Sequence, residues 1–318
     1  MKQAITKNSL LIVLAFAVVF AFAMKATVFQ DPSIAVTPST GVPDQDFAKY
    51  WFGGKAELNH YSLQQAQYGA LNPGEAILIF VTEDFRTDTQ VKSETEQLRD
   101  KSVPVMKTNI IKKFITGIYD YSLYTSVFTP INNPSHPNTL KVSTSGQEWC
   151  GHSYVQLNYA ANAYRVDGKS YFEKEVAENY EVEKTLLEDE LWNQIRLNPD
   201  KLPIGETHLI PGTMVARLRH KRLDPLPAKV KLAAYEGVLY PGKLLQAYTV
   251  QYPTDDRTLM IVFEQKFPHK IVGWEETYKS KDNLLTSRAV LKKTQQADYW
   301  SHNAPADSTL RQAFLSNP

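Results

Sequence analysis

The sequence contains little cysteine, no charge excess and no histidine motif, and each absence excludes a class of protein. A single cysteine among 318 residues excludes an intrachain disulfide framework and a zinc site built from cysteines. The 35 basic and 34 acidic side chains leave a net charge of +1, which offers no global field for nucleic acid. None of the seven histidines stands in an H-x-H or H-E-x-x-H spacing, so the sequence indicates neither a metal site nor a cofactor.

The residues that are present indicate a folded protein rich in β structure. Hydrophobic residues make up 43% of the chain and charged residues 22%, which excludes a disordered or collagen-like protein. The 17 tyrosines and 14 phenylalanines favour strands.

The first residues have the pattern of a signal peptide. Lys2 and Lys7 precede the uncharged apolar run Leu10–Met24, and Ala21-Phe22-Ala23 fits the small-x-small pattern that signal peptidase recognises. The run has 15 residues, fewer than the ~18 of a membrane-spanning helix. We therefore predict cleavage after Ala23 and export to the periplasm or cell envelope. The alternative is an uncleaved N-terminal membrane anchor.

Three segments follow from this pattern. Residues 1–23 are the predicted signal peptide, and residues 24–46, which are rich in Pro, Ser and Thr, are predicted to form a tether. Residues 47–318 are the predicted β-rich body, either a single domain or two tightly packed halves.

Alternating patterns in the body predict an antiparallel sheet. Hydrophobic residues alternate with polar ones around Val142, Val155 and Val230, whereas Glu75–Val81 is apolar enough for a central strand. Further apolar runs at 244–252, 258–266, 270–278 and 285–293 follow one another with short connections. The predicted fold class is mainly β or α+β, with a large curved antiparallel meander sheet that resembles half of a barrel.

Two segments are predicted to be helical. Residues Glu181–Asn198 carry Leu187, Leu191 and Ile195 at four-residue spacing and end before a proline, which predicts one interior helix. Asp307–Leu315 is predicted to be a short C-terminal helix.

The segment Trp149-Cys150-Gly151-His152-Ser153 is similar to a disulfide-isomerase site whose second cysteine is replaced by serine. The residues that follow alternate as a strand, whereas a thioredoxin-like site opens a helix, so we expect Cys150 to be a buried apolar residue at a strand start. The alternatives are a Cys150-dependent redox enzyme and a hydrolase in which Cys150 is the nucleophile and His152 the base.

The basic cluster Arg217-Leu218-Arg219-His220-Lys221-Arg222 is the other notable motif. On a strand, Arg217, Arg219 and Lys221 would share one face and could meet phosphates or anionic headgroups, although a solvated strand face is the simpler interpretation. Together with the aromatic residues Trp51 and Trp149, these three are the candidate ligand-binding residues.

Four segments carry a resemblance to a known family. They are Tyr50–Glu57 (YWFGGKAE), Gly74–Glu83 (GEAILIFVTE), Gln147–Gly151 (QEWCG) and Trp274–Ser280 (WEETYKS). Together they resemble an uncharacterised family of exported bacterial proteins that are often labelled "septum formation inhibitor Maf". The nucleotide pyrophosphatases that bear the name Maf carry an S-x-S-P-R-R loop, and no Ser-Pro-Arg-Arg occurs in this sequence. The resemblance therefore implies an envelope protein and no mechanism.

Two functional hypotheses of different classes follow. The first is a non-enzymatic envelope protein whose sheet binds an apolar or amphiphilic ligand, such as a lipid, or a protein partner. The second is a Cys150-dependent thiol redox or hydrolytic enzyme. A concave apolar sheet with a buried Cys150 would favour the first, and an exposed Cys150 near His152 and a carboxylate in a cleft would favour the second.

Overall fold

The computed structural model describes residues 45–175 and 177–316. The predicted signal peptide, and the predicted tether up to residue 44, lie outside these described residues. Within them, no helix is long and apolar enough to cross a membrane.

The described residues form one fifteen-stranded sheet, and the predicted fold class is confirmed. The order of the strands is β8-β7-β6-β5-β4-β3-β2-β1-β15-β14-β13-β12-β11-β10-β9, and every neighbouring pair is antiparallel except the short β9–β10 pair. The first eight strands are β1 (Ala56–Gln67), β2 (Ala70–Arg86), β3 (Ser102–Thr116), β4 (Tyr119–Pro130), β5 (Lys141–Glu148), β6 (Gly151–Ala160), β7 (Ala163–Ser170) and β8 (Ala177–Glu183). The others are β9 (Leu186–Leu187), β10 (Gly205–Ile210), β11 (Leu226–Ala234), β12 (Leu245–Tyr252), β13 (Arg257–Glu264), β14 (Ile271–Ser280) and β15 (Asn283–Ala297).

The sheet consists of two meanders that meet at β1 and β15. We call β1–β8 the first wing and β9–β15 the second wing. β1 pairs with β15 from Ala56↔Ala297 to Gln64↔Arg288, with one register shift after His60. This seam therefore joins strands that lie more than 200 residues apart in the chain.

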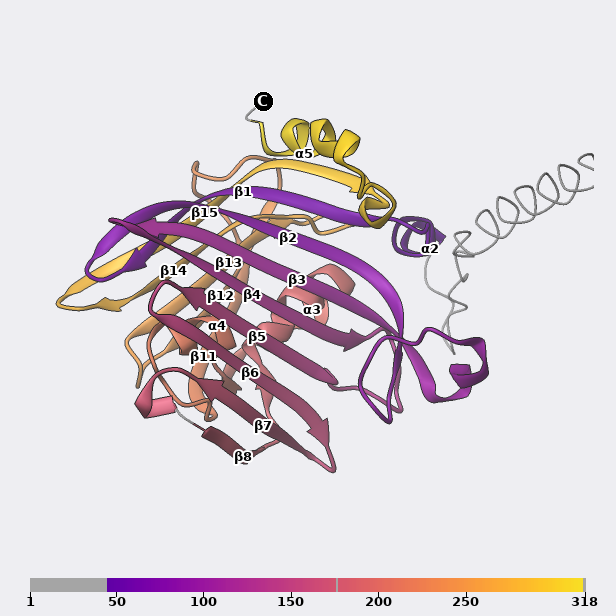
Figure 1. Ribbon diagram of the computed structural model, residues 1–318, viewed down its shortest axis with the longest axis horizontal. Helices are drawn as coiled ribbons and strands as arrows, with labels where there is room; N and C mark the ends of the chain where they lie inside the picture. The colour runs from indigo at the N-terminus through magenta and orange to yellow at the C-terminus, as the bar shows by residue number, and fades with distance from the viewer. Residues whose placement is uncertain (1–44, 176, 317–318) are drawn as a thin grey trace, which may run out of the picture. The chain divides into compact units, whose positions relative to one another are not determined.

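The two wings face each other, and two short helices lie between them (Figure 1). The helices of the described residues are α2 (Gln45–Trp51), α3 (Leu191–Leu197), α4 (Thr213–Leu218) and α5 (Ser308–Leu315). Helix α3 contacts both wings, because Asn193 donates a hydrogen bond to the Met106 carbonyl of β3 (3.0 Å) and Trp192 packs edge-on against Trp274 of β14. The largest hydrophobic cluster combines side chains of both wings with those of α3 and α4. The concave side of the sheet is thus filled by helices, and the core lies there.

The interior helix is present but begins later than the sequence pattern predicted. Residues up to Glu183 form β8, an edge strand paired with β7, and helix α3 begins only at Leu191. Leu187, which fits the helical spacing, belongs instead to β9. Tertiary pairing with β7 and β10 therefore overrides the local helical pattern in this segment. The C-terminal helix is confirmed as α5.

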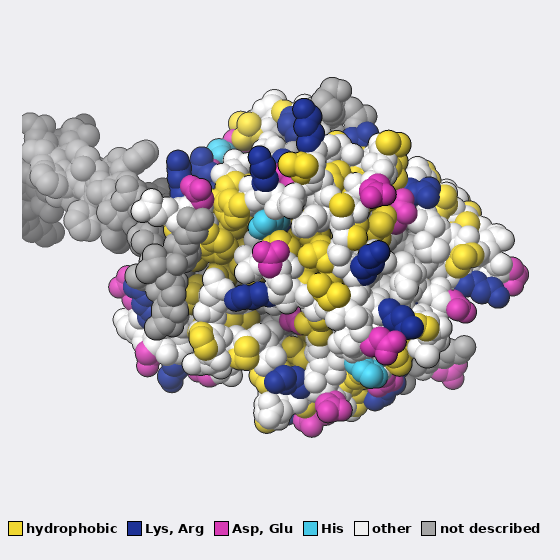
Figure 2. Space-filling model, turned by 180° about the vertical axis from the view of Figure 1, so that it is seen from behind, with side chains coloured by type: hydrophobic (Ala, Val, Ile, Leu, Met, Phe, Trp, Pro, Cys, Tyr) yellow, Lys and Arg dark blue, Asp and Glu magenta, His cyan; other side chains and the backbone are white. Residues whose placement is uncertain are grey.

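The strand patterns behave as predicted. Val142, Val155, Leu157 and Val230 are buried, and the apolar segment Glu75–Val81 lies within β2, between β1 and β3. Seen from behind, charged side chains of both signs are spread among hydrophobic ones (Figure 2).

Candidate functional site

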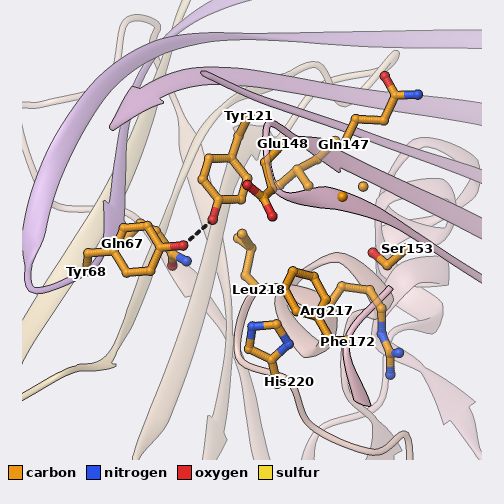
Figure 3. Close-up of a pocket in the computed structure, with 13 residues that line it drawn as sticks. Gln67, Tyr68, Tyr121, Gln147, Glu148, Ser153, Phe172, Arg217, Leu218 and His220 are labelled. Carbon is orange, nitrogen blue, oxygen red and sulfur yellow. Dashed lines mark hydrogen bonds between the residues drawn. The ribbon is translucent and has the colours of Figure 1, made fainter. Parts of the chain in front are cut away.

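A pocket opens between the first wing and α4, where the β1–β2 turn, the β5–β6 hairpin and the end of the helix converge (Figure 3). Its volume is ≈ 450 Å³, counted with the solvent at its opening. We call it the mouth pocket; its lining residues are Gln67, Tyr68, Tyr121, Leu123, Gly146, Gln147, Glu148, Gly151, Ser153, Phe172, Arg217, Leu218 and His220.

One wall of the mouth pocket is aromatic. Tyr121 stacks on Phe114 with ring centroids 4.8 Å apart, and its hydroxyl shares a 2.5 Å hydrogen bond with that of Tyr68. Tyr68 stands in the β1–β2 turn with a positive φ of 55°, next to Gly69 at 81°, as a tight hairpin turn requires. Burial and this hydrogen bond raise the pKa of the Tyr121 hydroxyl, so Tyr121 stays neutral.

The opposite wall is charged. Arg217 is buried and lies 3.4 Å from a Glu175 oxygen and 3.1 Å from a Glu178 oxygen. His220 Nδ1 lies 3.0 Å from Glu175, and its ring meets Phe172 edge-on. An amphiphilic molecule could therefore contact aromatic rings on one side of this pocket and ionic groups on the other.

Strand β4 and helix α4 lead from the mouth pocket to a second, deeper cavity. Alternate residues of a strand face the same side, so Tyr121 and Leu123 in the mouth pocket are followed by Thr125 in the cavity. Helix α4 places Leu218 in the first and Met214 in the second. We call this cavity the charged chamber; its lining residues are Ile110, Lys112, Thr125, Glu188, Asp189, Trp192, Gly212, Met214, Val215, Leu259, Trp274 and Glu276.

A buried arginine organises the acids of the charged chamber. Arg257 bonds Glu188 through both terminal nitrogens, and its Nε donates to Glu276 at 2.9 Å. The Tyr252 hydroxyl donates to Glu188 at 2.6 Å. Although burial alone would raise it, the charges of Arg257 and Lys112 lower the pKa of Glu276, so this carboxyl is ionised.

Lys112 is the unusual group in this chamber. It is 7% exposed, and its Nζ lies 5.5 Å from the centre of the Trp274 ring. Among the described residues, no carboxylate lies within 4.0 Å of this Nζ and no side chain accepts a hydrogen bond from it. Burial lowers the pKa of Lys112, while the charges of Glu276 and Glu188 act in the opposite direction.

Asp189 is a buried acid of the chamber whose pKa lies near neutral pH. Burial raises its pKa to about 7, partly opposed by the hydrogen bond that it accepts from the Thr213 backbone N–H at 2.9 Å. The Thr213 hydroxyl continues to Thr144 (2.6 Å) and from there to Thr125 (2.7 Å). A hydroxyl chain thus connects the helix that holds Asp189 in place to the wall of the chamber.

The neighbouring Glu190 faces elsewhere. It is buried against Thr139 and accepts a hydrogen bond from the Leu187 N–H at 3.2 Å, so it takes no part in the chamber. Adjacent carboxylates do not face each other on a helix or strand and are no evidence of an acid–base pair, so Glu188 and Asp189 were not predicted as functional candidates. Lys112 was not predicted either, although the buried alternation Thr108, Ile110, Lys112, Phe114 in β3 is a signal that could have identified it.

The expectation that Cys150 is buried is wrong. Cys150 is exposed, because Trp149 and Cys150 form the two-residue turn between β5 and β6 rather than the start of a strand. A hydrogen bond to Glu148 and the charge of that carboxylate raise the pKa of the thiol, which is the opposite of activation. His152 is also exposed, in β6. Neither residue lines the mouth pocket, although their neighbours Glu148, Gly151 and Ser153 do.

The basic cluster does not lie on a strand face. Arg217 belongs to α4, and Arg219 and Lys221 follow the helix and both contact Asp255. Each of the three is thus paired with at least one carboxylate. Only Arg217 reaches the mouth pocket, so the cluster is not a free anion-binding surface.

The two candidate tryptophans have different environments, and neither lines the mouth pocket or the charged chamber. Trp51 is buried at the end of α2, beside the guanidinium of Arg196 (5.0 Å) and the ring of Phe80. Trp149 is exposed, and its Nε1 donates to Asp120 at 2.7 Å. Among the described residues, no group of three His, Cys, Asp or Glu side chains could hold a metal ion.

Comparisons with known proteins do not place this chain in a family. No family model matches this chain. No curated protein matches it either, nor does any solved structure. The resemblance to the family labelled Maf therefore stays a prediction.

Proposed function

We propose that this protein is an exported envelope protein that binds a small amphiphilic molecule in the mouth pocket, without catalysing a reaction. The supporting observation is that the two cavities are built on the same strand and the same helix. The aromatic mouth pocket and the charged chamber share β4 and α4, so one molecule could place an apolar part against Tyr121 and Leu123 and a polar part toward Lys112.

The charge balance of the charged chamber indicates what kind of polar group the bound molecule would carry. Lys112 and Arg257 match Glu188 and Glu276, so the chamber is neutral when Asp189 is protonated. A neutral polar or zwitterionic headgroup would enter such a chamber without an uncompensated buried charge.

Occupancy of the mouth pocket is tested by filling it. Ser153 lines the pocket from β6, and Ser153→Trp would occupy its volume. The control is Ser122→Trp on β4, a half-buried position outside the pocket lining. The full chain, purified from envelopes, is analysed by native mass spectrometry for bound small molecules.

The wild type and the Ser122→Trp variant are expected to carry the same bound species, and the Ser153→Trp variant should carry none. An identical bound species in all three proteins, or no bound species in the wild type, would contradict the proposal.

A further inference from the structure

Four neighbouring hairpins present large hydrophobic side chains at one end of the sheet. Exposure is 82% for Ile118 in the β3–β4 turn, 68% for Trp149 in the β5–β6 turn and 67% for Leu284 beside the β14–β15 turn. Tyr68 in the β1–β2 turn is 45% exposed. We call these four residues the apolar tips.

The tips belong to neighbouring hairpins, and residues beside them connect some of these hairpins. The strands that carry them follow the order β6-β5-β4-β3-β2-β1-β15-β14, and their turns lie at the same end of the first wing and the seam (Figure 1). The Gly69 N–H of the β1–β2 turn donates to Ser280 beside the β14–β15 turn at 2.9 Å. The ring of Tyr68 lies 6.4 Å from that of Tyr119 beside the β3–β4 turn. The apolar tips therefore form a row of separate side chains along one end of the sheet.

Basic residues flank this row. Lys113, Lys279 and Lys281 are exposed beside the turns, and Lys281 Nζ lies 5.8 Å from the centre of the Tyr68 ring. The acids beside the same turns are Asp120, Glu148 and Asp282; Asp120 already accepts the hydrogen bond of Trp149 and Glu148 that of the Cys150 N–H. Hydrophobic tips with flanking lysines suit a surface whose interior is apolar and whose rim carries phosphates.

We propose that the apolar tips dock this protein on the surface of an anionic phospholipid bilayer. Ile118 and Leu284 enter the boundary of the acyl chains, Trp149 and Tyr68 lie at headgroup level, and the three lysines meet phosphates. Four separate protruding tips suit a deformable lipid surface better than the flat, closely packed patch that a protein partner requires. This proposal deepens the proposed function, since the mouth pocket includes Tyr68 and thus opens beside the docked surface.

The single cysteine provides a local test. Because Leu10–Met24 would by itself bring the full chain to a membrane, the measurement must report on the tips alone. Cys150 is exposed in the β5–β6 turn next to Trp149, so an environment-sensitive fluorophore attached to it senses the docked surface. The labelled full chain is titrated with vesicles of phosphatidylethanolamine and phosphatidylglycerol, and separately with vesicles of phosphatidylcholine.

Docking predicts that the emission shifts to shorter wavelength on the anionic vesicles and that added salt weakens the shift. Ile118→Asp and Leu284→Asp should each raise the lipid concentration at half-maximal shift by about tenfold. The matched control is Val238→Asp, at a fully exposed valine in the β11–β12 connection at the other end of the strands, which should leave the titration unchanged. All three side chains are exposed, so folding is not at risk.

Two results would overturn the docking proposal. One is a chain that sediments with the anionic vesicles while the Cys150 probe stays unchanged, as expected if the tips serve a protein partner or nothing. The other is a Val238→Asp variant whose lipid concentration at half-maximal shift rises as much as that of Ile118→Asp or Leu284→Asp. The variant Ser153→Trp separates this proposal from the proposed function. It should abolish ligand binding in the mouth pocket and leave the response of the Cys150 fluorophore to vesicles unchanged.

Discussion

Two arginines among the described residues are fully buried and paired with carboxylates, yet only one of them belongs to a candidate site. Arg196 forms two parallel hydrogen bonds with Glu57 at 2.6 and 2.7 Å, donates to the Pro268 carbonyl at 2.9 Å, and lies between the rings of Trp51 and Phe80. Arg257 instead shares Glu188 and Glu276 with Lys112 around a cavity.

The difference shows what distinguishes a site from a structural ion pair. All three nitrogens of the Arg196 guanidinium donate to an acceptor, and neither Arg196 nor Glu57 lines the mouth pocket or the charged chamber, so the role of the pair is to hold α3 against β1. The chamber around Arg257 contains a lysine without a hydrogen-bonded partner among the described residues and an acid that titrates near neutral pH. Groups with unused bonding capacity beside a cavity are those that a ligand can satisfy.

The largest expected effect on stability comes from breaking the ion pair between Arg196 and Glu57. Arg196→Met removes the partner of a carboxylate that is fully buried, so we expect the free energy of unfolding to fall by about 3–5 kcal/mol. Urea unfolding of the two proteins measures this difference. The control is the double variant Arg196→Met with Glu57→Gln, which should recover a substantial part of the loss. A single variant as stable as the wild type would show that the pair does not hold the fold.

Asp189 should make stability depend on pH. Its pKa rises from 3.8 to about 7 on folding, so the folded state keeps a proton that the unfolded state releases. Stability conferred by the protonated form is therefore full below about pH 4 and declines as the pH rises to about 7, by at most about 4 kcal/mol.

The variant Asp189→Asn should remove this decline, since the amide oxygen can still accept from the Thr213 N–H. Urea unfolding of wild type and variant at both ends of this pH window tests the expectation. The stability of the variant relative to wild type should increase with pH. A constant difference would mean that Asp189 is ionised throughout.

A smaller effect is expected from Lys112. Lys112→Met removes a charge that lowers the pKa of Glu276, but also a buried ammonium whose own pKa is lowered by burial, so we expect a loss of stability of about 1 kcal/mol or less, smaller than that of Arg196→Met. Adding Glu276→Gln should restore most of that stability, because Arg257 then balances Glu188 alone. Thermal unfolding of the four proteins in this cycle gives the coupling. Additive losses would show that Lys112 and Glu276 do not interact.

The smallest effect concerns the half-buried carboxylate Glu148. It raises the pKa of the Cys150 thiol, so in the folded protein Cys150 should react with a maleimide near neutral pH more slowly than free cysteine does. Glu148→Gln should speed this reaction without changing the melting temperature. Labelling of the wild type faster than free cysteine would instead indicate an activated thiol.

The sheet was predictable from local patterns, whereas the site was not. In strands such as Val155–Tyr159, hydrophobic residues alternate with polar ones, and this alternation identifies the buried face. The buried face is the same whichever strand is the pairing partner. The charged chamber depends on which strands the two wings bring opposite each other, and Lys112 and Glu276 are separated by 164 positions in the sequence. The Cys150 expectation failed because a two-residue turn and a strand start look alike in one sequence.

The seam between β1 and β15 has a consequence for how the chain matures. Each wing is made of hairpins whose strands are neighbours in sequence, so either wing can begin to form from local contacts as the chain is made. The seam requires residues of β1 to wait for β15, the last strand to be synthesised, and closing it is the step with the largest loop entropy. Until then the inner edges of both wings present unpaired backbone groups, which other chains could pair with. Pairing of the late strand β15 with β1 therefore covers the inner edges of both wings and leaves β8 and β9 as the edges of the sheet.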